Sequence, residues 1–350
     1  MKNFKKILAL AAVLVLVVGL VACGGKDSAN AGKDANADSS DAGSEDRKTV
    51  YFLTKILGNQ YWSVVEEGAR AAAEELGINI VVTGLATEAE VEKQVQQLQD
   101  AVSAQADAIV IGPTDSTAMA MPVENAFDSG IPIIIVDTMI NTDKYSVAYM
   151  TDNVEAGRMA AEEMIRLLKE NGVSEDEEAQ IAIQIGNSGS QTIIDRNKGF
   201  NEYWDANAPE KWVVLNDDIK VNDGDITKAV GFTQDFLTTY PNLKGVFGPN
   251  NGSTVGFVTG LTEAGREDVA LVGFDFSTEI EQMIRNGGFT VSTIVQKQYM
   301  MGYEGVKAGV ALSNGEEVAE KLVDTGTLIV NESNIDDADV QDIINPAKDK

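Results

Sequence analysis

From residue 49 to residue 295, short apolar runs alternate with longer stretches in which apolar residues recur every three or four positions. The runs have few polar residues inside them, which is typical of strands covered on both faces in a parallel sheet. The longer stretches, such as 64–76 and 91–104, predict amphipathic helices. The predicted strands are 49–54, 78–82, 107–111, 131–136, 179–185, 211–216, 244–248, 270–274 and 289–295.

This alternation predicts an α/β fold built from strand–helix–strand units with right-handed crossovers. So many strands would make a large single sheet, so two sheets fit better, one over 49–150 and one over 152–296. The sequence therefore predicts two doubly wound parallel-sheet domains. Such folds bind ligands at the carboxyl ends of their strands, which places the expected binding site in a cleft between the domains.

The first 22 residues have the pattern of a targeting segment. Lysines 2, 5 and 6 precede an apolar run over 7–21, which is too short for an ordinary spanning helix. The segment resembles the bacterial lipoprotein signal, which implies cleavage before Cys23 and a lipid on its sulfur. The alternative is an ordinary signal peptide with an incidental cysteine, but the chain has a single cysteine and it stands at that position.

Residues 24–48 are small and polar, with no large apolar side chain. Such a stretch cannot bury enough surface to offset the entropy of ordering it. We therefore expect residues 23–48 to be a lipidated, disordered tether that holds a folded body at the outer face of the cell membrane.

Composition excludes several classes of function. The chain has 350 residues with 44% hydrophobic residues, and 27 basic against 55 acidic residues give a net charge of −28. A surface this negative repels phosphate backbones, so no nucleic-acid partner is expected. The absence of histidine excludes Ser-His-Asp chemistry and His-ligated metals, and one cysteine excludes an intrachain disulfide. No metal or cofactor is expected.

The loops after the predicted strands carry polar and aromatic side chains suited to a hydroxyl-rich ligand. Carboxylates and amides share hydrogen bonds with sugar hydroxyls, and aromatic rings pack against the C–H faces of sugars. Each residue also has a plainer interpretation. The aromatics could be core, Asp137 could be a turn residue, and Asn250 could cap the helix at 252–264. Asp195 and Arg196 could form a surface ion pair.

Six segments in order make a more specific resemblance. They read LGNQYW, GPTDSTA, IPIIIVDT, TDNVEAG, YPNLKGVFGPNN and LVGFDFS. Together they resemble the type I periplasmic sugar-binding family, over about residues 49–330. The resemblance implies two α/β domains joined by three hinge crossings, one made of 49–151 plus 297–326 and the other of 152–296 plus 327–350. It also implies closure on a monosaccharide for an ABC importer, and no catalysis.

The resemblance also implies contact positions. They are Asn59, Tyr61, Trp62 and Asp137 from the first domain, and Asn250, Asp275 and Gln296 from the second.

Three positions depart from the pattern of ribose binders. Thr138 stands where an arginine is common, the arginine expected in the helix after the Gly-rich loop falls on Ile194 beside Asp195 and Arg196, and the third aromatic falls on Gly224. These departures weigh against D-ribose as the ligand.

Lys55 and Pro249 are instead similar to residues in receptors for a furanosyl quorum signal and related deoxy sugars. The working hypothesis is that one lysine and four polar residues hold the ligand: Lys55 and Asp137 from the first domain, with Asp275, Asn250 and Asp195 from the second. Thr138, beside Asp137, and Arg196, beside Asp195, complete the predicted set of ligand-binding residues.

The resulting expectation is an extracytoplasmic, monomeric binding lipoprotein that captures a monosaccharide or related small polyol and passes it to an ABC permease complex. The alternative is a sensory receptor that presents a furanosyl signal or deoxy sugar to a membrane signalling partner. A dehydrogenase-like enzyme is less compatible, because the Gly-rich loop 186–190 lacks the spacing of a dinucleotide-binding motif.

Overall fold

The computed structural model describes residues 47–346. The predicted signal peptide, Cys23 and nearly all of the predicted tether lie outside the described residues. In the described part of the chain, no helix has the length and apolar character needed to cross a bilayer.

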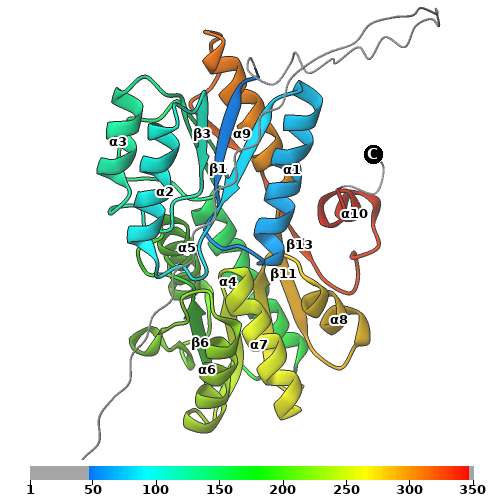
Figure 1. The fold of residues 1–350 in the computed structure, drawn as a ribbon. Helices are drawn as coiled ribbons and strands as arrows, with labels where there is room; N and C mark the ends of the chain where they lie inside the picture. Colours follow the sequence, from blue (N-terminus) through cyan, green and yellow to red (C-terminus); the bar gives the residue numbers. More distant parts are fainter. Residues whose placement is uncertain (1–46, 347–350) are drawn as a thin grey trace, which may run out of the picture. The chain divides into compact units, whose positions relative to one another are not determined.

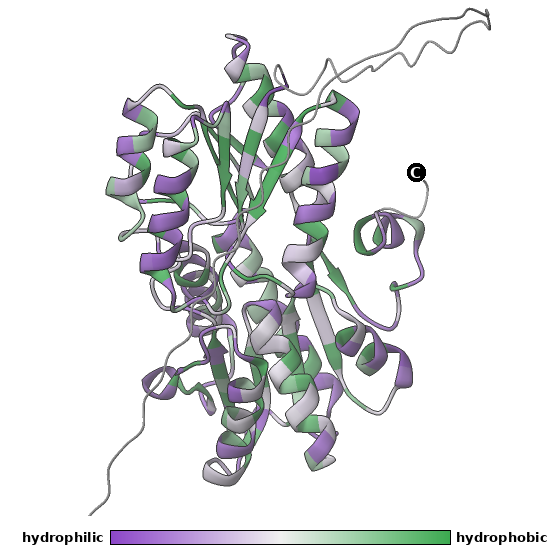
Figure 2. Cartoon of the chain, viewed as in Figure 1, coloured by the Kyte–Doolittle hydropathy of each residue, from purple (hydrophilic) through white to green (hydrophobic). Residues whose placement is uncertain are grey.

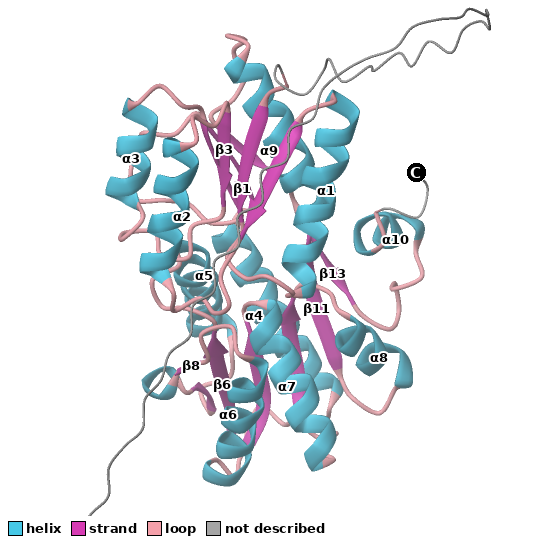
Figure 3. Ribbon diagram, in the orientation of Figure 1, coloured by secondary structure: helices cyan, strands magenta, loops and turns pink. Residues whose placement is uncertain are grey.

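The first sheet is wholly parallel, in the order β12-β5-β4-β3-β1-β2. Figures 1 and 3 show this sheet between two pairs of helices. One pair is α1 (Gln60–Leu76) and α9 (Gln298–Ser313), and the other is α2 (Val91–Ser103) and α3 (Ala120–Asp128). The strands are β1 (Thr49–Leu53), β2 (Asn79–Thr83), β3 (Ala108–Ile111), β4 (Ile133–Val136), β5 (Val147–Met150) and β12 (Leu322–Asp324).

Both faces of this sheet are buried, which explains why its strands read as continuous apolar runs. In β4, Ile134 and Val136 pack with α1 and α9, whereas Ile133 and Ile135 pack with α2 and α3. Successive side chains of a strand point to opposite faces, so each face receives alternate residues. Figure 2 shows the strands as mainly hydrophobic and the covering helices as mixed.

The second sheet has the order β13-β11-β10-β9-β6-β7, with β8 paired to β6. Only its edge pair β11–β13 is antiparallel among the described strands. The helices are α4 (Asn153–Glu170), α5 (Gln191–Asn207), α6 (Ile226–Thr239), α7 (Asn251–Ala264), α8 (Thr278–Asn286) and α10 (Ala338–Ile344), with a 3-10 turn at Asn216–Asp218. The strands are β6 (Ala179–Ile185), β7 (Trp212–Val214), β8 (Lys220–Val221), β9 (Leu243–Gly248), β10 (Ala270–Phe274), β11 (Val291–Gln296) and β13 (Thr327–Val330).

The predicted fold class is thereby confirmed, with two parallel-sheet α/β domains that share one strand order. Leaving β8 aside, the spatial order β13-β11-β10-β9-β6-β7 of the second sheet repeats, strand for strand, the order β12-β5-β4-β3-β1-β2 of the first. β4 therefore corresponds to β10.

The chain passes from one sheet to the other after β5, after β11 and after β12, and the passages bond to one another. Thr151 Oγ1 donates to Gln296 Oε1 at 2.8 Å, and the Thr325 N–H donates to the Met150 carbonyl at 2.7 Å. Asp152 N–H donates to Asp324 Oδ1 at 3.2 Å. These bonds tie the connections together side by side.

The apolar pattern missed several strands and overextended another. The strand expected over 211–216 is only Trp212–Val214, because Asn216 begins the 3-10 turn. β5, β8, β12 and β13 were not predicted. β12 lies at a sheet edge with Leu322 about half exposed, so its sequence lacks the unbroken apolar run of a central strand.

Candidate functional site

The loops that follow the strands of both sheets enclose a small cavity of about 30 Å³. The described residues around it come from both domains: Lys55, Ile56, Asn59, Tyr61, Trp62, Glu88 and Asp137 from the first, and Ser190, Thr192, Ile193, Arg196, Gly224, Asn250, Asn251, Gly252 and Asp275 from the second.

Asp137 is the acidic centre of the first domain's half. It follows β4 with a φ of 65°, in the left-handed region that turns the chain sharply after a strand. Its carboxylate accepts hydrogen bonds from Tyr61 Oη and Thr138 Oγ1, both at 2.7 Å, and lies 3.1 Å from Lys55 Nζ. Burial by itself raises the pKa of Asp137, but Lys55, Arg196 and the two hydroxyls outweigh burial and hold that pKa below its ordinary value.

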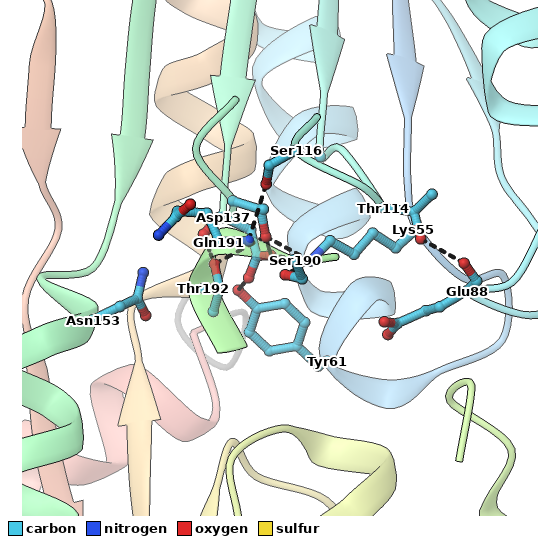
Figure 4. Close-up of polar contacts among 12 residues, drawn as sticks. Lys55, Tyr61, Glu88, Thr114, Ser116, Asp137, Asn153, Ser190, Gln191 and Thr192 are labelled. Carbon is cyan, nitrogen blue, oxygen red and sulfur yellow. Dashed lines mark hydrogen bonds and ion pairs between the residues drawn. The ribbon is translucent and has the colours of Figure 1, made fainter. Parts of the chain in front are cut away.

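Lys55 follows β1 and reaches across to the second domain (Figure 4). Its Nζ donates to Thr138 Oγ1 at 2.5 Å and to Ser190 Oγ at 3.3 Å. Thr192, like Ser190 at the start of α5, bonds to Thr138 Oγ1 at 2.9 Å and donates to the Asp137 carbonyl at 2.9 Å. Lys55 therefore neutralises Asp137 and also bonds to the opposite domain.

Asp275 occupies the corresponding place in the second domain. It follows β10, as Asp137 follows β4, and its φ is 69°. Gln296 Nε2 donates to its Oδ1 at 2.7 Å, and Gln296 is in turn held by Thr151. Burial raises the pKa of Asp275 to about 6, against the opposing effects of Arg196 and the Gln296 bond.

Arg196 supplies a guanidinium that is 2% exposed. Its Nε donates to Asn153 Oδ1 at 2.9 Å, its Nη1 donates to the Pro249 carbonyl at 2.6 Å, and its Cζ lies 3.9 Å from the centre of the Phe274 ring. Within the described residues its Nη2 has no hydrogen-bond partner. The Nε and Nη1 atoms of the guanidinium are thus held in place, while the Nη2 donor has no partner.

Close helix packing sets the place of Arg196. A Cβ at Gly157 of α4 would lie 2.1 Å from the Arg196 carbonyl oxygen, and one at Gly199 of α5 would lie 1.9 Å from the Val154 carbonyl oxygen. Because neither glycine has a side chain, α4 and α5 meet backbone to backbone. This contact fixes which face of α5 meets the cavity.

Tyr61 and Trp62 form the aromatic wall. Both are at least 95% buried, with ring centres 5.4 Å apart and planes at 89°. A Cβ at Gly112 would lie 2.4 Å from Trp62 Cη2, so the glycine makes room for the indole. The two aromatics belong to the core and also line the cavity, so the core interpretation holds and their packing against a ligand stays a prediction.

Three amides lie at the helix starts that face the cavity. Asn59 caps α1, since its Oδ1 accepts from the Trp62 N–H at 3.3 Å, and its Nδ2 donates to Asn251 Oδ1 at 3.0 Å across the domains. Asn250 precedes α7 but its side chain does not cap that helix. Among the described residues, Asn250 Oδ1 and Asn251 Nδ2 are buried without a hydrogen-bond partner.

The predicted site residues thus divide into three groups. Lys55, Asn59, Tyr61, Trp62, Asp137, Arg196, Asn250 and Asp275 line the cavity. Thr138 and Gln296 are buried behind the lining and hold the two aspartates. Asp195 is not part of the lining, and its Oδ1 accepts from Gln191 Nε2 at 2.8 Å.

Two sequence interpretations need correction. The surface ion pair between Asp195 and Arg196 is wrong, because the Arg196 guanidinium is buried on Asn153 and Pro249. The arginine expected at Ile194 is also misplaced, since Ile194 is 46% exposed and Arg196 takes the place at the cavity.

Glu88, Ser190, Thr192 and Asn251 also line the cavity but were not among the predicted contact residues. The two hydroxyl residues open a helix after the Gly-rich loop, which is a usable signal. Glu88 lies in a loop with no strand directly before it, so the sequence pattern indicates a solvent-exposed glutamate. No group of His, Cys, Asp and Glu in residues 47–346 is arranged to hold a metal ion.

Comparisons with known proteins agree with this architecture. The family model described as periplasmic binding protein domain matches residues 50–317. The chain belongs to the periplasmic binding protein family. The resemblance to its type I sugar-binding members is thereby confirmed, and this is a family of binding proteins, not of enzymes.

Similar proteins in the family include curated relatives and solved structures. The ribose import binding protein RbsB of Escherichia coli is 28% identical over 275 residues, covering 79% of this chain and 88% of the relative. The D-apiose import binding protein of Actinobacillus succinogenes is 27% identical over 304 residues, covering 87% and 91%.

Among solved structures, a carbohydrate transporter solute binding protein from Agrobacterium radiobacter in complex with D-arabinose matches with a TM-score of 0.81 and 30% identity. It covers 86% of this chain and all of that one. An ABC transporter solute binding protein from Agrobacterium vitis with bound D-fucose has a TM-score of 0.78 and 29% identity, covering 85% and 99%.

Proposed function

We propose that this protein captures a monosaccharide in the cavity between its domains and delivers it to an ABC importer. The observation that carries the proposal is the pairing of Asp137 and Asp275 at corresponding strand ends, with the donors of Lys55 and Arg196 beside them. Hydroxyls both donate and accept, so a sugar can bond to carboxylates and cations together. The relatives named as import binding proteins and the solved transporter solute binding proteins support delivery to an importer. No observation favours the alternative of a sensory receptor.

Each domain contributes half of the polar groups, so only a closed arrangement can make every contact with a ligand. Because the cavity is lined by residues of both domains, a ligand enters when the domains separate. We propose the boundaries 49–151 plus 297–326 and 152–296 plus 327–350 for the moving lobes. A ligand then shifts the open–closed equilibrium through its higher affinity for the closed form.

The site residues are proposed as follows. Asp137, Asp275 and Asn250 accept hydrogen bonds from ligand hydroxyls, and Arg196 Nη2 and Asn251 Nδ2 donate, because these donors and the Asn250 acceptor are buried without partners in the described residues. Tyr61 and Trp62 pack against the C–H face of the ring. Lys55 exchanges a bond to Ser190 for one to the ligand.

Cys23 is the proposed lipidation site, which would hold the monomeric binding domains at the outer face of the cell membrane through residues 23–48. Incorporation of radiolabelled palmitate into the full chain, and its loss in Cys23→Ala, is the expected result. Equal labelling of both chains would refute the anchor without touching the sugar site.

Calorimetric titration with D-ribose, D-arabinose, D-fucose and D-galactose tests the binding function. We expect at least one sugar to bind, and Arg196→Met to weaken that binding by ~10- to 100-fold, because a charged donor is lost. Arg158→Met, in α4 on the surface, is the matched control. Absence of binding by every neutral sugar would refute the proposal.

A further inference from the structure

Glu88 lies in the loop between β2 and α2, and its backbone joins the two domains. Its N–H donates to the Asp223 carbonyl at 3.0 Å, and its carbonyl accepts from Thr114 Oγ1 at 2.9 Å and from Asn187 Nδ2 at 3.1 Å. Asp223 and Asn187 belong to the second domain. The backbone bonds therefore fix the position of the Glu88 side chain once the domains are together.

The Glu88 carboxylate lines the cavity without a partner of its own. The residue is 7% exposed, and within the described part of the chain its carboxylate makes no hydrogen bond or ion pair. Figure 4 shows Thr114 contacting its carbonyl while the side chain extends toward Tyr61. A Cβ at Gly186 would lie 3.1 Å from Glu88 Oε2 and 2.8 Å from Asn250 Nδ2, so the glycine leaves room for both groups.

Neither of the two cations that line the cavity forms an ion pair with Glu88. Lys55 pairs with Asp137 at 3.1 Å, and Arg196 is held by Asn153 and Pro249. The cavity thus carries three carboxylates, on Glu88, Asp137 and Asp275, against two cations. Burial raises the pKa of Glu88, which reflects the cost of keeping a charge there without hydrogen bonds. A ligand that donates to this carboxylate removes that cost, and an anionic ligand increases it.

We propose that Glu88 is a specificity-determining residue that accepts a hydrogen bond from a hydroxyl of an uncharged sugar and excludes acidic sugars. This inference rests on the proposed function, because it concerns the same cavity. It adds a contact from a loop that was not among the predicted site residues. It also states the ligand class more narrowly, as neutral monosaccharides rather than uronates.

The test compares the wild-type chain, Glu88→Gln and Glu92→Gln by calorimetric titration. Glu92 is an exposed glutamate in the first turn of α2, so its variant controls for the loss of one negative charge nearby. The ligands are the neutral sugar that the wild type binds most tightly and D-galacturonate. Glutamine keeps the size of the side chain, and melting temperatures of the three chains establish that all are folded.

We expect Glu88→Gln to bind the neutral sugar ~10- to 100-fold more weakly, because a bond to a charged acceptor is lost. Its preference for the neutral sugar over D-galacturonate should fall by a similar factor, while Glu92→Gln matches the wild type. If folded Glu88→Gln keeps wild-type affinity and preference, the role of Glu88 is refuted and the binding function stands. If the wild type binds no neutral sugar, both proposals fail.

Discussion

Asp275→Asn should make the ligand-free protein more stable at neutral pH. Burial raises the pKa of Asp275 to about 6, from an ordinary value of 3.8. That difference corresponds to ~3 kcal/mol, by which the buried, ionised carboxylate lowers the free energy of unfolding above pH 7. Asparagine carries no charge and can still bond to Gln296, so the variant should recover most of this amount.

The sign of the pH dependence follows from the raised pKa. Well below pH 4, Asp275 is protonated in both the folded and the unfolded protein, so it costs no stability there. As the pH rises from 4 toward 6, Asp275 ionises in the unfolded protein but stays protonated in the folded protein, and the free energy of unfolding therefore falls. The stability gained by Asp275→Asn should therefore be close to zero near pH 4 and reach its maximum above pH 7.

Urea unfolding of both chains at several pH values between 4 and 8 measures the difference. Asp235→Asn, at an exposed position of α6, is the control and should show no such trend. The same Asp275→Asn chain should bind sugar more weakly, because a charged acceptor is replaced. A stability difference that stays constant with pH, or a variant less stable than wild type at pH 7.5, would show that the reasoning about Asp275 is wrong.

Three other substitutions probe the groups around the cavity. Lys55→Met should lower the free energy of unfolding by ~3–5 kcal/mol at pH 7, because Asp137 stays buried without its cation. This loss should shrink in acid as Asp137 becomes protonated. A loss that does not change with pH would contradict the explanation. Tyr61→Phe should cost ~1–3 kcal/mol in urea unfolding, through the lost bond to Asp137, whereas unchanged stability would mean the bond is unimportant. Gly157→Ala should cost ~1–3 kcal/mol and also weaken sugar titration by displacing Arg196; a cost in stability with wild-type affinity would separate the two effects.

Much of the fold was accessible from the sequence because the central strands are buried on both faces. Runs such as 107–111 and 131–136 are apolar throughout, since alternate residues face opposite helix layers. β12 and β13 could not be found in this way. They are short strands at the sheet edges, paired with segments far away in the chain, and local pattern carries little information about such pairing.

The sequence by itself also determined half of the described residues that line the cavity. Asp137 and Asp275 end apolar strands, and the carboxyl ends of parallel strands meet at one edge of a sheet. Only the tertiary structure decided that Arg196, rather than Ile194, faces the cavity, because the contact of α5 with α4 at Gly157 and Gly199 sets that helix face. It alone also revealed Glu88, since a loop glutamate becomes a buried carboxylate only when bonds to Asp223 and Asn187 bring the second domain against it.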